Sequence, residues 1–526
     1  MTIHDETLGN MTVFNVPLPE GTRDVNGTYT PSGRVLVADR KSRDQDDYAV
    51  YTLNDDGSVV RNIFEGTIPQ HRTANGIRWM CFSDNRRVLL GDYVLECEKS
   101  LDVEGQAHLI PVVYPEPLMA YPGLFRHWSE IIISPDRKHI VWTMLTFNGA
   151  DNFIGTLTRK EKEYVIEDVY CISSRTMFKA DSNKSGYALP QTVRGGEVKQ
   201  FIQGGRAISL VGNSDSLSDS VVEELDTGAA WQFTHTAGYE ETAIFSPDET
   251  LAICMSPRFS KRTNCDILGL IPLPYSAHAR GPIVNAAYQY AIASERMFRK
   301  GLIGPALVDV HRTRKEGRTY EGVNLGDPEN KFVYYSPMSW APCGTKALWN
   351  ESTRIAEPPF VSRLQAVHLL DRKPCTPLPA VPTPDGKDIP YAIPLAEYLN
   401  TRPEIPPLPY RIAGKASGEV ICEQDETGWR TVRYDAFSDD GKTFLTGTFA
   451  TKSPASIFEA GENIIRAKLR VWGEHTGEAD YRLTFTQENI MSPVVLSFAD
   501  ANNHLSATYG FSRYDKTTVQ AEDMDS

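Results

Sequence analysis

The chain has 526 residues, a formal net charge of −14 and a hydrophobic content of 41%. This composition is ordinary for a globular protein, and the length allows several domains or one large repeat fold. The acidic balance argues against nonspecific nucleic-acid binding, although local arginines decide whether a smaller anion binds. No apolar run reaches about 18 residues, so we expect no transmembrane helix.

The first ten residues are polar, which predicts no secretory signal. Eight cysteines are scattered along the chain without a C-x-x-C pair or zinc-type spacing. We therefore expect reduced, mostly buried thiols in a cytoplasmic protein that does not interact with membranes.

A short phrase recurs along the chain, in which an apolar strand end, a tight polar turn and a second apolar strand follow one another. The clearest copies carry Ser-Pro-Asp at the turn and begin at Ile133 and Phe245. In chain order the copies begin at Tyr29, Phe82, Ile133, Phe201, Phe245, Trp340, Phe437 and Leu496. Repeats at intervals of tens of residues indicate a solenoid or a propeller, and a strand-turn-strand unit predicts an all-β fold, a β-propeller.

The number of phrases predicts the number of blades. Counting every copy gives eight blades, which we favour, and leaving out the degraded copy at Leu496 gives seven. The strand-like segment from Met11 to Val16 is expected to complete the blade begun by the C-terminal hairpin, because such closure hides the sheet edges. Residues 1–519 would then form a single propeller domain.

Two insertions interrupt the repeats. Residues 276–325 contain an apolar stripe at helical spacing, which predicts a helix that serves as a lid or packs on the propeller flank. Residues 374–409 are dense in proline, which cannot donate to a sheet ladder, so we expect an ordered loop that crosses the surface or a spacer. Residues 520–526 are acidic and are expected to be a flexible tail.

Three histidines fall in the loops that lead into the inner strands of different blades. In a propeller these lead-in loops share one mouth of the central channel, so His71, His127 and His235 would face the same space. With Glu240 or Glu241 as a further ligand they would suit a divalent Mn, Fe, Ni or Zn ion. The alternatives are metal-free acid–base chemistry and loop histidines that only hydrogen-bond the backbone.

Other side chains of the lead-in loops suit catalysis or substrate binding. The candidate catalytic residues are His127, His235, Tyr239, Arg78 and Arg126. The candidate substrate-binding residues are Trp79, Trp128, Glu130, Glu241, Tyr335, Arg433 and Tyr434. Apolar walls with a few convergent polar groups are typical of a small-molecule pocket, and arginines bind carboxylates through a bidentate fork. The alternative is that the aromatic rings pack between blades.

The Ser-Pro-Asp phrases at Ile133 and Phe245 resemble the repeats of TolB-like propellers, also called WD40-like Pro-Asp repeats. Oligogalacturonate lyases are enzymes with such repeats, and His127 and His235 precede the phrase here in a similar way. That resemblance implies a cytoplasmic protein with histidine-bound manganese that cleaves an anionic sugar chain by β-elimination. This chain is longer, has two large insertions and shows no closely spaced histidine pair.

The favoured function is an enzyme of the lyase or isomerase type that acts on a carboxylated, sugar-like or aromatic small molecule at the channel mouth. A base would remove a proton, and an arginine or a metal would stabilise the resulting anion. The alternatives are a non-enzymatic interaction platform and a hydrolase with a metal-bound water. No G-x-S-x-G elbow, P-loop or dinucleotide-binding glycine pattern occurs.

Overall fold

The computed structural model describes most of the chain. The described residues are 1–41, 46–69, 79–119, 124–146, 149–174, 177–192, 194–213, 217–260, 265–274, 283–284, 286–297, 299–400, 406–454, 461–487 and 503–521. Among these residues no helix is both long and apolar enough to cross a membrane.

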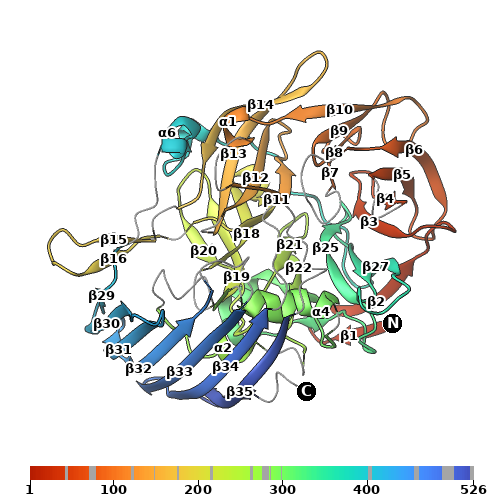
Figure 1. Ribbon diagram of the computed structural model, residues 1–526. Coiled ribbons are helices and arrows are strands. Elements are labelled where there is room, and N and C mark those ends of the chain that lie inside the picture. The colour runs from red at the N-terminus through yellow and green to blue at the C-terminus, as the bar shows by residue number, and fades with distance from the viewer. Residues whose placement is uncertain are drawn as a thin grey trace.

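The chain forms a β-propeller of six described blades, each with four antiparallel strands (Figure 1). Blades 1 to 3 comprise β3 (Asp24–Tyr29), β4 (Val35–Arg40), β5 (Asp47–Leu53) and β6 (Val59–Thr67); β7 (Trp79–Cys81), β8 (Arg87–Leu90), β9 (Tyr93–Cys97) and β10 (Ala107–Val113); and β11 (Leu124–Ile133), β12 (His139–Thr146), β13 (Gly149–Arg159) and β14 (Tyr164–Cys171). A short helix, α1 (Glu116–Met119), joins blades 2 and 3.

Blades 4 to 6 continue the ring. They comprise β17 (Glu197–Ile202), β18 (Ala207–Asn213), β19 (Ser218–Glu224) and β20 (Ala230–Gln232); β21 (Thr242–Phe245), β22 (Leu251–Ser256), β23 (Gly304–Asp309) and β24 (Val323–Asn324); and β25 (Val333–Trp340), β26 (Lys346–Ser352), β27 (Ser362–Leu369) and β2 (Gly9–Val16). In blade 5, α5 (Val310–Glu316) follows β23. The short strand β1 (Thr2–Asp5) pairs with β2 at the rim of blade 6.

The first strands of the blades contact one another around the ring. Neighbouring contacts join β3 to β7, β11 to β17, β17 to β21, β21 to β25, and β25 back to β3. The backbone N–H of Ile133 in β11 donates to the sulfur of Met80 in β7 at 3.3 Å, which joins blades 2 and 3. At the outer rim the same two blades also meet through a short parallel pairing of β10 with β14.

The N-terminal strand closes the ring by completing blade 6. β2 pairs antiparallel with β27, with Val13 opposite Val367. The expected closing strand at Met11–Val16 is therefore confirmed as a strand. Its partner was predicted wrongly, because it completes the blade of the Trp340 phrase and not a C-terminal hairpin.

The recurring phrase forms the tight turn between the first and second strands of each blade. In blade 5 the Ser246 N–H donates to the Leu251 carbonyl at 2.8 Å, and the Ser246 hydroxyl donates to Asp248 at 2.7 Å. Glu249 then takes a left-handed backbone with φ of 57°, as Arg137 does in blade 3 with φ of 65°. Ser and Asp recur in the phrase because their side chains close this turn.

The blades that the sequence predicted after blade 6 are not formed. The strands from Tyr410 onward make one eight-stranded antiparallel sheet in the order β29 to β36. We call it the C-terminal sheet: β29 (Tyr410–Ala413), β30 (Ser417–Gln424), β31 (Arg430–Ser438), β32 (Thr443–Lys452), β33 (Gly461–Gly473), β34 (Gly477–Gln487), β35 (Asn503–Tyr514) and β36 (Thr517–Gln520). The Phe437 phrase is the turn between β31 and β32, and the Leu496 phrase begins outside the described residues. The counts of eight and seven blades are thus corrected, because the same turn also joins strands of a continuous sheet.

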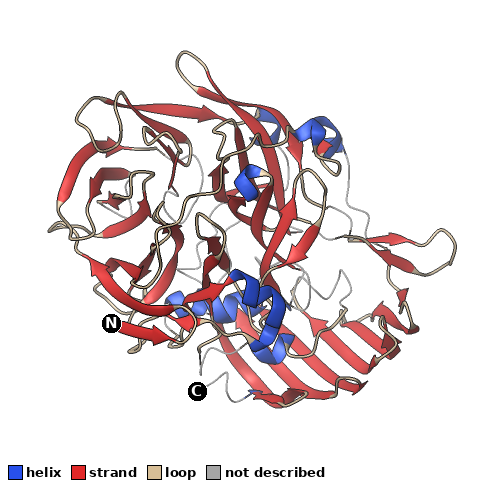
Figure 2. Ribbon diagram, turned by 180° about the vertical axis from the view of Figure 1, so that it is seen from behind, coloured by secondary structure: helices blue, strands red, loops and turns tan. Residues whose placement is uncertain are grey.

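The helical insertion joins the propeller to the C-terminal sheet. It lies between β22 and β23, in residues 257–303, and contains α2 (Asp266–Gly269), η2 (Gln289–Ala293) and α4 (Ser294–Met297). The predicted range of 276–325 therefore took in β23 and β24, which belong to blade 5. Figure 2 shows the insertion between the propeller and the C-terminal sheet.

Side chains of the insertion belong to one apolar core with blades 5 and 6 and the sheet. Ile292 is fully buried in this core, and the ring of Tyr290 lies edge-on to Phe485 of β34 with centroids 5.8 Å apart. The hairpin of β15 (Phe178–Ala180) and β16 (Ala188–Pro190) joins the same core, with Phe178 beside Tyr410. Of the two positions expected for the helical insertion, a lid or a helix packed on the propeller flank, the structure shows the second.

The proline-rich segment is an ordered loop that crosses the turns of four blades, which is the first of the two forms expected for it. We call residues 372–385 the strap. Its backbone N–H groups donate to successive turns: Cys375 to the Cys343 carbonyl at 2.8 Å, Leu378 to the Pro247 carbonyl at 2.9 Å, Val381 to the Gly204 carbonyl at 3.0 Å and Thr383 to the Asp136 carboxylate at 3.0 Å. After the strap come η4 (Gly386–Asp388), β28 (Ile393–Pro394), which pairs with β14, and α6 (Leu395–Asn400).

A buried histidine fastens the end of the strap to blade 3. His139 Nε2 lies 3.0 Å from Asp385 and Nδ1 lies 3.5 Å from Asp136. Burial alone would lower the pKa of His139, but the hydrogen bonds to Asp136 and Asp385 outweigh it and raise that pKa above its ordinary value. When it is protonated, His139 therefore joins Asp385 of the strap to Asp136 of blade 3.

This contact makes the stability contributed by Asp385 depend on pH. Since the folded pKa of His139 is raised, the stabilisation is complete below the unfolded value of about 6.5 and is lost as the pH rises through the folded pKa. Asp385 is half-exposed, so we expect Asp385→Asn to lower the free energy of unfolding by about 1 kcal/mol at pH 6 and by less at pH 9. Urea denaturation of Asp385→Asn and of the control Asp388→Asn measures this. Equal losses at both pH values would contradict the contact.

Candidate functional site

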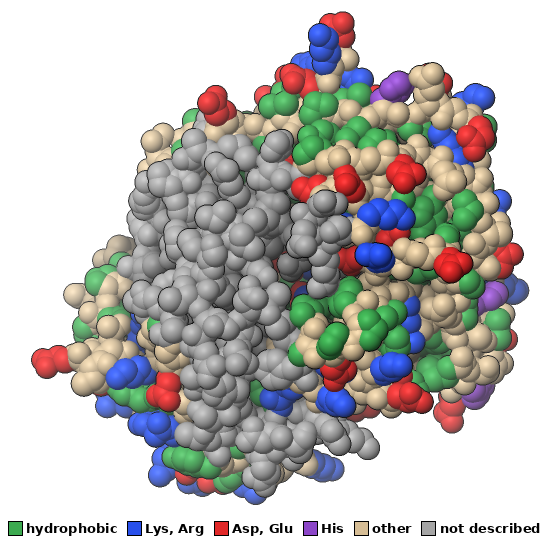
Figure 3. All heavy atoms as spheres, turned by 45° about the vertical axis from the view of Figure 1, so that its right-hand side comes forward, with side chains coloured by type: hydrophobic (Ala, Val, Ile, Leu, Met, Phe, Trp, Pro, Cys, Tyr) green, Lys and Arg blue, Asp and Glu red, His purple; other side chains and the backbone are tan. Residues whose placement is uncertain are grey.

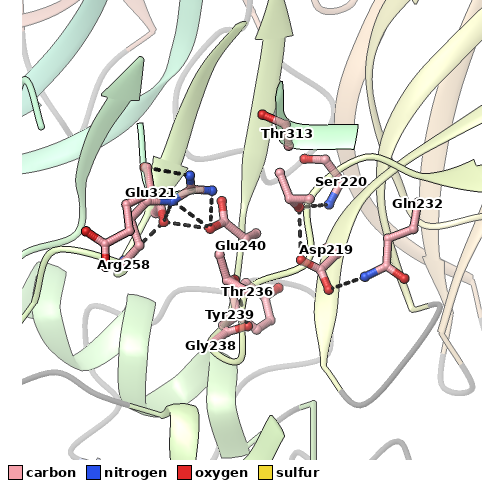
Figure 4. Close-up of polar contacts among 12 residues, drawn as sticks. Asp219, Ser220, Gln232, Thr236, Gly238, Tyr239, Glu240, Arg258, Thr313 and Glu321 are labelled. Atoms are coloured by element: carbon pink, nitrogen blue, oxygen red, sulfur yellow. Dashed lines mark hydrogen bonds and ion pairs between the residues drawn. The ribbon is translucent and has the colours of Figure 1, made fainter. Parts of the chain in front are cut away.

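The loop between blades 4 and 5 carries four of the residues that the sequence singled out. It runs from Phe233 to Glu241 and leads into the inner strand β21, as expected for a lead-in loop. Its start is fixed by a polar network, in which the Thr234 hydroxyl donates to Asp219 at 2.9 Å and accepts from the Ser220 N–H at 2.9 Å (Figure 4). The Gln232 amide donates to the other oxygen of Asp219 at 2.8 Å.

Glu240 is held in a buried ion pair. Its carboxylate lies 2.8 Å from the Arg258 guanidinium and accepts a hydrogen bond of 2.6 Å from the Ser256 hydroxyl. Arg258 also donates to the Glu321 carbonyl at 2.9 Å, so both ends of the pair are anchored (Figure 4). Burial acts to lower the pKa of Arg258, but Glu240 raises it overall, so the guanidinium stays charged.

The predicted metal centre gains no support from the described residues. Glu240, a proposed ligand, is engaged by Arg258, and no group of three or more His, Cys, Asp or Glu side chains among the residues described could hold a metal ion. His71 lies outside the described residues, as do the side chain of His127 and all of Arg78. The metal site therefore stays a prediction.

Tyr239 is buried between the loop and the helical insertion. Its backbone N–H donates to the Cys265 sulfur at 3.2 Å, and its ring lies against Tyr288 with centroids 5.7 Å apart. Burial, together with the nearby Glu241, raises the pKa of Tyr239 well above its ordinary value. The phenol stays protonated near neutral pH, so Tyr239 can donate a proton or a hydrogen bond but does not suit the role of base.

Asp266 is a residue of this site that sequence reasoning missed. It opens α2 in the helical insertion, directly after the buried Cys265, and it is partly exposed. Burial raises the pKa of Asp266 to about 6; Arg318 opposes this rise, and the negative charge of Glu240 adds to it. A carboxyl group with such a pKa can take up and release protons near neutral pH.

Glycine at position 238 is what allows Asp266 to lie so close to the lead-in loop. A Cβ atom on Gly238 would sit 2.6 Å from a carboxylate oxygen of Asp266 and 3.3 Å from Pro257. These contacts are too short for any other residue without movement. Burial also raises the pKa of the neighbouring Cys265 thiol to about 12, so that thiol is inert and packs as part of the core.

The remaining candidates lie in several places. Trp79 is buried against Tyr48, with ring centroids 6.3 Å apart, and so forms part of the core between blades 1 and 2. Tyr335 is half-buried and faces the helical insertion, with the Arg296 guanidinium 4.7 Å from its ring centroid. Glu241 is buried, and His235 is half-buried in the lead-in loop.

Four candidates lie on the inner strand of blade 3 and not in a loop. They are Arg126, His127, Trp128 and Glu130, all within β11. Their side chains lie outside the described part of the structure. The register of β11 with β12 shifts on both sides of Trp128, so the strand is irregular where these residues lie.

Arg433 and Tyr434 are not at the channel mouth, contrary to the prediction. Both lie on β31 of the C-terminal sheet, Arg433 on its exposed face and Tyr434 on its buried face. The Tyr434 hydroxyl donates to the Pro274 carbonyl of the helical insertion at 3.2 Å. The error follows from taking the Phe437 phrase for a blade, since residues before a blade phrase would lead into an inner strand.

No protein-family profile matches the sequence, and no curated protein is similar to it in sequence. Similar solved structures include a putative TolB from Agrobacterium tumefaciens, with 14% identity and a TM-score of 0.32 over 63% of this chain and 92% of that one. TolB from Acinetobacter baumannii matches with 10% identity and a TM-score of 0.27 over 67% of this chain and 64% of that one. Hydrazine synthase from Kuenenia stuttgartiensis matches with 12% identity and a TM-score of 0.30 over 64% and 79%. The propeller fold described here rests on the sheet topology.

The Glu240–Arg258 pair predicts a large loss of stability when one partner is removed. Because Arg258→Met leaves the Glu240 carboxylate buried without its cation, we expect the free energy of unfolding to fall by about 3–5 kcal/mol. The matched control is Arg206→Met, which removes an exposed guanidinium 3.5 Å from Asp226 and should cost less than about 1 kcal/mol. Denaturation curves of both variants measure the difference, and equal, small losses would show that Glu240 does not depend on Arg258.

Proposed function

We propose that the protein is an enzyme that performs acid–base chemistry on a small organic molecule where the blade 5 lead-in loop meets the helical insertion. The observation that carries the proposal is Asp266, a half-buried residue whose carboxyl pKa is raised to about 6 by burial beside the Glu240–Arg258 ion pair. Strongly shifted ionisable groups with a stated physical cause are typical of functional sites.

Each neighbour of Asp266 has a role in the proposed chemistry. Asp266 takes a proton from the substrate as a general base and returns it as a general acid. The cation of Arg318 acts on the same carboxyl and limits the rise of its pKa. The protonated hydroxyl of Tyr239 and the half-buried His235 of the lead-in loop are candidates for a second proton transfer.

The reaction is proposed to be of the lyase or isomerase type, on a carboxylated, sugar-like or aromatic substrate. Removal of a proton beside a carboxylate or carbonyl needs a base with a pKa near the working pH, and Asp266 meets this requirement. The proposal needs no metal, and a metal-bound water would lead instead to hydrolysis. The mass of the products separates these reactions, because elimination and isomerisation add no water.

The proposal predicts the effect of replacing Asp266. A panel of uronate oligosaccharides, hydroxy acids and phenolic carboxylates, followed by mass spectrometry, identifies a substrate whose products together have its mass. We expect Asp266→Asn to lower kcat about 10²–10⁴-fold, because the amide cannot carry the proton. With the wild type, kcat/KM should rise with pH through about 6, where the carboxyl ionises.

Asp388→Asn, a surface variant in η4, is the control for this experiment and should keep full activity. Circular dichroism spectra that match the wild type would show that Asp266→Asn is folded. A folded Asp266→Asn variant with wild-type activity would contradict the proposed role of this carboxyl group. Products heavier by one water would identify a hydrolase.

A further inference from the structure

The C-terminal sheet has one buried and one exposed face. Along β33 the buried side chains of Ile465, Ala467, Leu469 and Val471 alternate with exposed ones. The buried face packs on the helical insertion, and the exposed face includes residues of β31 to β35. Such alternation, with one face in solvent, is ordinary for an antiparallel sheet. Only the residue types on the exposed face can therefore indicate whether it binds a partner.

Cations line the exposed face of β33. Arg466, Lys468 and Arg470 occupy successive exposed positions and are thus about 7 Å apart. The opposing residues on β32 are the small Ala450, Thr448 and Thr446, and Arg433 on β31 lies beyond Thr448. Long cationic side chains therefore flank a strand of small residues, which makes a shallow cationic strip across β31 to β33.

One row of this face pairs like charges. Arg466 lies directly opposite Arg482 of β34, and Tyr509 of β35 is the next residue in the row. Arg482 is half-buried, and its buried Nε atom has no hydrogen-bond partner. Like charges directly opposite one another destabilise a sheet, so an anion bound beside this row would remove a repulsion and satisfy a donor.

Acidic residues lie on both sides of the strip. On β34, Asp480 is opposite Lys468, and Glu478 is opposite Arg470 and 3.3 Å from Arg513. On β31, the exposed Asp435 lies two positions after Arg433. The positive charge is therefore strongest around Arg433, Arg466 and Arg482. Figure 3 shows Lys and Arg side chains at the lower left of the molecule, with Asp and Glu side chains among them.

Aromatic rings border the strip. Trp472 is 40% exposed and stacks on Phe444 with centroids 4.3 Å apart and an angle of 11° between the rings. The Arg466 guanidinium lies 4.3 Å from the ring centroid of Trp429, and Tyr509 is 60% exposed. A large apolar ring left in water costs free energy, so rings at both ends of a cationic strip indicate a partner with flat faces and negative charge.

We propose that the exposed face of the C-terminal sheet binds single-stranded nucleic acid. The phosphates of such a polymer can pair with the cations of the strip, and its unpaired bases can stack on the exposed rings. Proteins that bind single-stranded nucleic acid combine a cationic surface for the backbone with aromatic side chains for the bases in this way. An acidic polysaccharide would match the cations but has no aromatic faces to stack. The overall charge of −14, from which no nucleic acid was expected, is compatible with this because the strip itself is cationic.

Fluorescence anisotropy of a labelled 20-nucleotide oligo-dT or oligo-U with the full chain tests the proposal. We expect the triple variant Arg466→Gln, Lys468→Gln, Arg470→Gln to weaken binding at least tenfold and to lower the slope of log K against log salt by about 2, at about 0.7 for each charge removed. Trp472→Ala should weaken binding about tenfold through lost stacking. The matched control neutralises three exposed lysines outside the sheet, Lys99→Gln, Lys162→Gln and Lys179→Gln, and should leave affinity within twofold.

Three outcomes would overturn the proposal. The first is that the wild type fails to bind either oligonucleotide at 50 mM salt. The second is that the control variant loses as much affinity as the triple variant. The third is that heparin or vesicles with anionic lipid bind more tightly than the oligonucleotides and Trp472→Ala has no effect, which would identify a different polyanion. Arg433→Gln alone, on β31, provides a second variant in case the triple variant does not fold, and it should weaken binding about threefold.

Discussion

The packing of the helical insertion is the contact on which the rest of this structure depends. An eight-stranded sheet has to bury one face, and here that face is covered by the insertion that leaves blade 5 after β22. The same insertion packs on blades 5 and 6, so one apolar core holds the propeller and the sheet together. It also brings Asp266 against the lead-in loop of blade 5, which means that the candidate site exists only where this core is formed.

The propeller is held closed in two further ways. β2, from the start of the chain, supplies the last strand of blade 6, so the ring has no free edge there. The strap then crosses the turns of blades 6, 5, 4 and 3 in order, and each of its backbone hydrogen bonds contributes about 1 kcal/mol. The strap can form these hydrogen bonds because each proline lacks only its own N–H group. The N–H groups of the residues between the prolines remain available as donors, and those of Cys375, Leu378, Val381 and Thr383 are used.

The sequence predicts local structure here better than it predicts assembly. Ser134-Pro135-Asp136 and its relatives specify a turn through their own side chains, so strand-turn-strand units were identified correctly from Tyr29 to Phe437. The blade count went wrong because the Phe437 phrase specifies only a turn, and the following strands decide whether it belongs to a blade. The sequence did contain a signal against a blade here, since buried and exposed residues alternate from Ile465 to Val471 within β33, and this strand of 13 residues is longer than any strand of the propeller.

The candidate site was predicted only in part. The lead-in loop of blade 5 was found because it directly precedes the Phe245 phrase, and Tyr239, Glu240 and Glu241 lie in it. Residue spacing could not show the contacts of Glu240 and Tyr239, because Arg258 and Cys265 come into contact with them only through tertiary packing. Asp266 belongs to no motif, and its raised pKa comes mainly from burial, with an addition from the charge of Glu240, both of which arise only in the folded chain.

In the proposed function, packing of the insertion desolvates Asp266 and prepares it for proton transfer. Infrared difference spectroscopy of the wild type against Asp266→Asn, recorded from pH 3.5 to 8, isolates the carbonyl stretch of this one protonated carboxyl group. We expect the band to disappear with a midpoint near pH 6, because burial raises the pKa of this carboxyl group. A midpoint at the ordinary aspartate value of 3.8 would show a solvated side chain and would contradict both the packing and the proposed chemistry.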